Sequence, residues 1–222
     1  MDKFLIIKKG CVCMEKTEIE KRDLKPIFIY LGCSLILPLL LVVPFVLMKM
    51  NENLANTIVE FITFLVMGIL LLKLYHKRIM GDLKEISLKK LLLVLLIGIV
   101  ACIINEMLTP NITTDNQELI IKMVKTLPIL SFFCICILGP FAEEMVFRYS
   151  FDTFIKNDIL FIVVSSFIFG LIHTNGFSSG WWLYVLLGLL FSCVYIKTNH
   201  NIVLSTIIHV LLNIVDFIFI IL

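Results

Sequence analysis

Long apolar runs separated by short polar segments are the feature that most restricts the fold of this 222-residue chain. Hydrophobic residues make up 60% of it and charged residues 16%, whereas soluble domains have about 45–50% and about 25%. A helix needs about 20 apolar residues to cross a bilayer. We therefore predict an all-α, polytopic transmembrane helical bundle with about seven spans, over Pro26–Met48, Leu54–Leu74, Leu88–Leu108, Thr126–Leu138 running into the acidic stretch that follows, Ile159–His173, Trp181–Ile196 and Ile202–Leu222.

Basic residues are divided unevenly between the segments that flank these spans. Seven precede Pro26 and six lie from Lys73 to Lys90. Later segments on the same side add Arg148, Lys156 and Lys197, whereas the opposite side has Lys49, Lys122 and Lys125. Because cytoplasmic loops are enriched in Lys and Arg, we expect a multi-pass cell-membrane protein with a cytoplasmic N-terminus and a cytoplasmic tail over residues 1–25. The net charge of +2 reflects this orientation, and we expect no nucleic-acid binding.

Ionisable and amide side chains are concentrated in the last four predicted spans. The first three spans have almost none away from their ends, whereas the later ones contain Glu143, Glu144, Arg148, His173, His209, Asn213 and Asp216. An ionisable group inside a membrane costs about 2.5–3.5 kcal/mol on insertion scales, and by default it is a candidate functional residue. We therefore separate an N-terminal transmembrane region, residues 26–125, from a helical core that carries the chemistry, residues 126–222.

The segment GPFAEEMVFRYS places two adjacent glutamates beside an apolar run. Arg148 lies four residues after Glu144 and therefore on the same helical face, so we expect it to neutralise that carboxylate. Glu143 points about 100° away and is left to face a cavity as a general base. Pro140 fits a helix start or a kink, which would put both glutamates in a first turn. The alternative is a helix end at the membrane surface, where these charges are only solvated.

Two further motifs supply imidazoles and an amide. His173 ends one predicted span, and His209, Asn213 and Asp216 follow an i, i+4, i+7 spacing that gives the last span one polar stripe. Hydrogen bonding between helices, worth about 0.6 kcal/mol on average, is the alternative reading of such a stripe. Considered together, however, a carboxylate, two imidazoles and an amide are the groups needed to activate water and stabilise an oxyanion. We therefore favour an enzyme that hydrolyses an amide bond.

The three motifs resemble those of the CPBP family, which includes type II CAAX prenyl proteases and bacterial Abi proteins. The matching stretches are EEMVFR, FGLIH and HVLLN, which correspond to EExxxR, FxxxH and HxxxN. The resemblance implies that Glu143 and His173 activate water, that His209 and Asn213 form the oxyanion hole, and that Glu144 and Arg148 support the site. It also implies that the N-terminal region is variable. Tyr149 departs from the family, which often has Gly after the Arg, and the role of Asp216 stays open.

The resemblance does not decide whether the site uses a metal ion or what the biological role is. Zinc held by Glu143, His173 and His209 is one alternative, but HExxH is absent and we favour a glutamate-dependent mechanism without a cofactor. The expected partners are the lipid bilayer and a peptide or membrane-protein substrate, in bacteriocin or peptide-signal processing or in self-immunity. The rival interpretation is a non-catalytic bacteriocin-immunity or membrane binding protein on the same fold.

Overall fold

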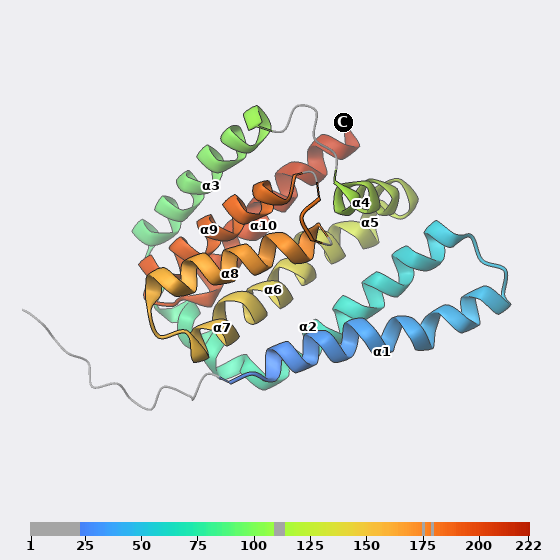
Figure 1. Ribbon diagram of the computed structural model, residues 1–222, viewed down its shortest axis with the longest axis horizontal. Coiled ribbons are helices and arrows are strands. Elements are labelled where there is room, and N and C mark those ends of the chain that lie inside the picture. The colour runs from blue at the N-terminus through green and yellow to red at the C-terminus, as the bar shows by residue number, and fades with distance from the viewer. Residues whose placement is uncertain (1–22, 109–113, 175, 179) are drawn as a thin grey trace, which may run out of the picture.

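The computed structural model describes residues 23–108, 114–174, 176–178 and 180–222, and within these ranges it is helical without strands (Figure 1). The predicted all-α class is therefore confirmed. Of the predicted cytoplasmic tail, residues 1–22 lie outside the described part of the chain. The elements are α1 (Lys25–Leu47), α2 (Glu52–Lys84), α3 (Leu88–Leu108), α4 (Asp115–Thr126), α5 (Pro128–Ser131), η1 (Phe132–Leu138), α6 (Gly139–Glu144), η2 (Met145–Ser150), α7 (Phe151–Phe154), α8 (Asp158–His173), α9 (Trp181–Lys197) and α10 (Ile202–Ile221).

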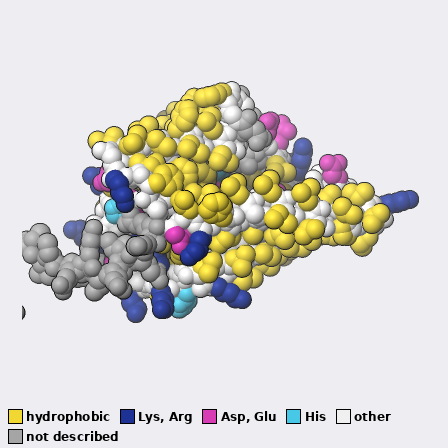
Figure 2. Space-filling model, turned by 60° about the horizontal axis from the view of Figure 1, so that its bottom comes forward, with side chains coloured by type: hydrophobic (Ala, Val, Ile, Leu, Met, Phe, Trp, Pro, Cys, Tyr) yellow, Lys and Arg dark blue, Asp and Glu magenta, His cyan; other side chains and the backbone are white. Residues whose placement is uncertain are grey.

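Five helices in the described ranges are long and apolar enough to cross a membrane. They are α1, α2, α3, α10 and the continuous helix Pro128–Phe154 formed by α5 to α7. Two more apolar helices, α8 and α9, have 16 and 17 residues. Figure 2 shows apolar side chains over most of the face that it views. A multi-pass membrane protein follows from these helices, while the count of seven spans and the orientation stay predictions.

The central helix is longer than we predicted from the sequence. The span expected at Thr126–Leu138 instead continues from Pro128 to Phe154, through two π-helical segments, η1 and η2. Glu143 and Glu144 therefore lie in the middle of a helix, so a helix start at Pro140 was wrong. Pro140 lies next to the change from η1 to α6, and the alternative of a kink there stays a prediction. The polar segment can stay helical inside the bundle because its charged groups find partners there. π-Helical turns of this kind are frequent at functional sites.

Helix α4 was not predicted, because it lies in a segment that we read as a polar connection. Its start has the pattern of a capping box: Thr114 accepts a hydrogen bond from the backbone of Gln117 at 3.2 Å. Apolar residues then recur at helical spacing, and Met123 and Val124 are buried. The helix packs against α2, α5 and α10. These signals were present in the sequence, but the high polarity of the segment obscured them.

Other helices of the bundle pack around the central helix, Pro128–Phe154, and fix the position of its polar residues. It contacts α1 and α2 on one side and α10 on another, while α3 packs against α10 (Figure 1). Helices α8 and α9 form the closest pair of the bundle. At Gly188 an added Cβ would lie 2.8 Å from the Cα of Ser166, and at Gly170 it would lie 3.0 Å from the backbone nitrogen of Val185. Small residues at such positions let helix backbones approach closely.

We expect Gly188→Ala to destabilise the protein. The added methyl group meets the backbone of Ser166, which cannot move without separating α8 from α9, and overpacking of this kind costs about 1–3 kcal/mol. Thermal unfolding in detergent should show a midpoint lowered by several degrees. The matched control is Gly81→Ala in α2, where a Cβ meets nothing within 4 Å. Equal midpoints for the two variants would contradict the close packing.

Candidate active site

Glu144 and Arg148 form a fully buried ion pair at the centre of the bundle. Arg148 Nε lies 3.2 Å from Glu144 Oε2, and both side chains have no exposed surface. The pair follows from the i, i+4 spacing across α6 and η2, as predicted. Ser205 of α10 donates a hydrogen bond to the same carboxylate oxygen. Glu144 therefore has one partner on its own helix, Arg148, and one on α10, Ser205, so it links these two helices.

The guanidinium of Arg148 has further partners that the sequence did not reveal. One of its nitrogens donates to the hydroxyl of Ser165 at 3.1 Å, and that hydroxyl donates to the carbonyl of Phe147. Its carbon atom also lies 5.2 Å from the ring centre of Phe169 and 5.6 Å from that of Phe191. Cation–π contacts stabilise a desolvated cation. Arg148 is thus held in the core of the bundle, away from the pocket.

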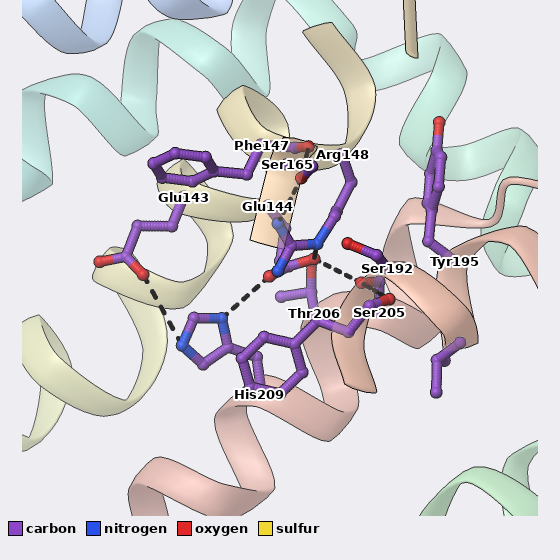
Figure 3. A network of polar contacts seen from close by, with 12 residues as sticks. Glu143, Glu144, Phe147, Arg148, Ser165, Ser192, Tyr195, Ser205, Thr206 and His209 are labelled. Atoms are coloured by element: carbon purple, nitrogen blue, oxygen red, sulfur yellow. Dashed lines mark hydrogen bonds and ion pairs between the residues drawn. The ribbon is translucent and has the colours of Figure 1, made fainter. Parts of the chain in front are cut away.

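Glu143 points in a different direction, towards two imidazoles. Its Oε2 lies 3.3 Å from His173 Nε2 and 3.7 Å from His209 Nε2. Figure 3 shows the imidazole of His209 between the two carboxylates, with Glu143 on one side and Glu144 on the other. The adjacent glutamates therefore face separate surroundings, as the 100° step between neighbouring helical residues requires.

Each imidazole is oriented by its second ring nitrogen. His173 Nδ1 is 2.8 Å from the carbonyl oxygen of Phe169, which can only accept, so Nδ1 is the donor there. His209 Nδ1 is 3.0 Å from Glu144 Oε1. Both Nε2 atoms are consequently directed at Glu143. Phe191 fixes the plane of His209 as well, because the two rings stack with 4.2 Å between their centres.

Glu143, His173 and His209 line one pocket of about 260 Å³ that reaches from α1 and α2 to α9 and α10. Asn213 and Asp216 contribute to it from the polar stripe of α10. The amide nitrogen of Asn213 donates to the carbonyl of Ile135 at 2.9 Å, which leaves its second hydrogen for a ligand. The pocket can hold water, since one molecule occupies about 30 Å³. Among the lining residues that we did not single out from the sequence are Glu60, Asn116 and Tyr184.

Tyr149, where the sequence departs from the family motif, is not among the residues that line this pocket. It is buried, and its ring packs edge-on against Tyr75 of α2 with 5.1 Å between the ring centres. The neighbouring core includes Met145 and Ile202. A phenol at this position therefore fills the contact between η2 and α2 without displacing either imidazole.

The arrangement does not fit the zinc alternative. In the described part of the chain, no group of three His, Cys, Asp or Glu side chains is placed to hold a metal ion. Glu143 and the two imidazoles instead contact one another directly. The amide of Asn213 is suited to hydrogen bonding and not to zinc ligation. These side chains are therefore better suited to proton transfer and hydrogen bonding than to zinc binding.

Comparison with known families identifies the segment that contains most of this site. Residues 125–215 match the family described as type II CAAX prenyl endopeptidase, Rce1-like. This segment is an Rce1-like domain of the CPBP family. The Rce1-like domain contains both glutamates, Arg148, both pocket histidines and Asn213. Membership implies an intramembrane endopeptidase. No curated protein and no solved structure matches the chain.

Proposed function

We propose that the protein is a glutamate-dependent intramembrane endopeptidase in which Glu143 is the general base. The observation that carries the proposal is the position of Glu143, whose Oε2 is within 3.7 Å of both pocket imidazoles while Arg148 is bound to Glu144. A carboxylate without its own cation can accept a proton. General bases of this kind contribute about 10²–10⁴-fold to a rate.

The proposed reaction uses only side chains of this chain and one water molecule. Glu143 takes a proton from water, and the hydroxide bonds to the carbonyl carbon of the peptide. His173 orients the water and the carboxylate. Hydrogen-bond donors from the amide of Asn213 and from Nε2 of His209 stabilise the oxyanion. As the C–N bond breaks, Glu143 returns the proton to the leaving nitrogen, which yields a new carboxyl group and a new amine.

The proposed substrates are membrane-associated peptides or membrane proteins. A pocket lined by apolar residues of several helices suits a chain that arrives from the bilayer. We propose a cell-membrane protein with seven spans and a cytoplasmic N-terminus, in which α8 and α9 complete the five longer helices. The proposed biological role is bacteriocin or peptide-signal processing, or self-immunity that depends on cleavage.

Peptides from cells that have or lack the protein provide the test of this function. Cells should be grown in the two states, and secreted and cell-surface peptides compared by mass spectrometry. We expect products that need the protein, and we expect the purified protein to form them from a synthetic precursor. In water enriched in ¹⁸O, each new carboxyl terminus should gain one heavy oxygen atom. Identical peptide profiles in both states would contradict the proposal.

A further inference from the structure

Tyr184 of α9 connects an imidazole of the site with the helix that covers it. Its ring is stacked on that of His173, with 5.1 Å between the centres and 23° between the planes. The ring of Phe169 lies 4.0 Å from the same imidazole at 32°. The imidazole of His173 therefore packs against one aromatic ring from its own helix, α8, and against another from α9. Tyr184 is thus one of the two aromatic residues that restrict the orientation of the His173 ring.

The hydroxyl of Tyr184 is used elsewhere, at the beginning of α4. It lies 3.1 Å from the hydroxyl of Thr114, and it accepts a hydrogen bond from the amide of Asn116 at 3.2 Å. Thr114 is buried and is the N-cap of α4. Asn116, Ile120 and Met123 place α4 along the pocket that contains Glu143. One side chain therefore contacts both the covering helix and the imidazole.

The proposed hydrolysis does not need the phenol for any chemical step. A phenylalanine would stack on His173 equally well, so the hydroxyl serves the connection to α4. We propose that Tyr184 is a positioning residue, which makes the orientation of His173 depend on α4 lying in place across the pocket. This inference rests on the proposed function of His173.

Such a connection couples the imidazole to α4. Displacement of the start of α4 would break the hydrogen bonds to Tyr184, and the phenol ring would then no longer be held against His173.

The experiment compares four variants in the full-length protein. Tyr184→Phe keeps the ring and removes the hydroxyl, Asn116→Ala removes the donor from α4, and Tyr184→Leu removes the ring. Tyr195→Phe is the matched control, because Tyr195 lies on the same helix and its hydroxyl donates to Asp152, away from the pocket. Each variant is assayed for kcat and KM. In addition, the reaction of His173 with diethyl pyrocarbonate is followed by mass spectrometry in the inactive Glu143→Gln background.

We expect Tyr184→Phe and Asn116→Ala each to lower kcat by about fivefold, the effect of one hydrogen bond. The double variant should be no slower than Tyr184→Phe, because loss of the hydroxyl already removes the hydrogen bond from Asn116. Tyr184→Leu should lower kcat further, and His173 should react faster with the reagent in all three variants. Tyr195→Phe should leave kcat and this reaction unchanged.

Two results would overturn the inference. One is multiplication of the single effects in the double variant, which would mean that Tyr184 and Asn116 act independently. The other is an unchanged reaction of His173 in Tyr184→Leu. If the proposed function is wrong, cleavage will persist in Glu143→Gln. The reaction of His173 with diethyl pyrocarbonate would still show whether Tyr184 positions this histidine.

Discussion

Replacing Glu143 with glutamine is expected to lower kcat for peptide cleavage by at least about 10³-fold, within the range of general-base contributions. Glutamine has the same shape but cannot accept a proton from water at this position. The side chain can still contact His173 and His209, which lie 3.3 and 3.7 Å away in the wild type, so the fold and membrane insertion should be unchanged. The measurement is cleavage of an identified peptide by purified protein.

The matched control for this variant is Glu60→Gln. Glu60 lines the same pocket from α2, but in the described part of the chain its carboxylate has no ion pair with either imidazole. Its replacement removes one pocket charge without removing the proposed base, so cleavage should stay within a few fold of the wild type. Wild-type cleavage by Glu143→Gln would refute the assignment. Immunity that survives in this variant would instead favour the non-catalytic binding role.

The second large effect is expected from Arg148→Ala. It leaves Glu144 as a buried carboxylate without its cation, and breaking a buried ion pair from one side costs about 3–5 kcal/mol. We expect little folded protein in the membrane, and a strongly lowered unfolding midpoint for the fraction that can be purified. Lys156→Ala, which alters an exposed residue between α7 and α8, is the control for loss of a positive charge.

A double variant separates charge imbalance from loss of packing. Glu144→Gln combined with Arg148→Met removes both charges and keeps most of the volume. Replacing a whole buried pair by uncharged groups is often close to neutral, so the double variant should be more stable than Arg148→Ala. An equal or lower midpoint would show that the contacts of Arg148 with Ser165 and Phe169 matter more than its charge.

Helical periodicity accounts for the parts of the site that were predictable. A spacing of four residues placed Arg148 on Glu144, and the step to the next residue turned Glu143 towards another environment. The same rule put His209, Asn213 and Asp216 on one face of α10, where they line the pocket. Apolar length likewise predicted the long helices. Each of these inferences depends only on residues within one helix.

Contacts between distant segments were not predictable in the same way. Ser205 binds Glu144 from α10, and Phe169 and Phe191 pack around Arg148, but phenylalanine and serine also occur at many other positions of the chain, where they have no such role. The extent of the central helix was misjudged for a related reason. Hydropathy treats Glu144 and Arg148 as groups that need water, whereas in the folded chain they satisfy each other.

The lengths of α8 and α9 have a consequence for the surrounding lipid. At 1.5 Å per residue, helices of 16 and 17 residues measure about 24–26 Å, whereas the hydrocarbon layer is about 30 Å thick. If the chain spans the membrane seven times, thinning of the adjacent bilayer is one way in which this hydrophobic mismatch would be relieved. Headgroups and water would then come closer to the end of α8, where His173 lies. We therefore expect the acyl-chain length of the host membrane to affect how readily water reaches the pocket.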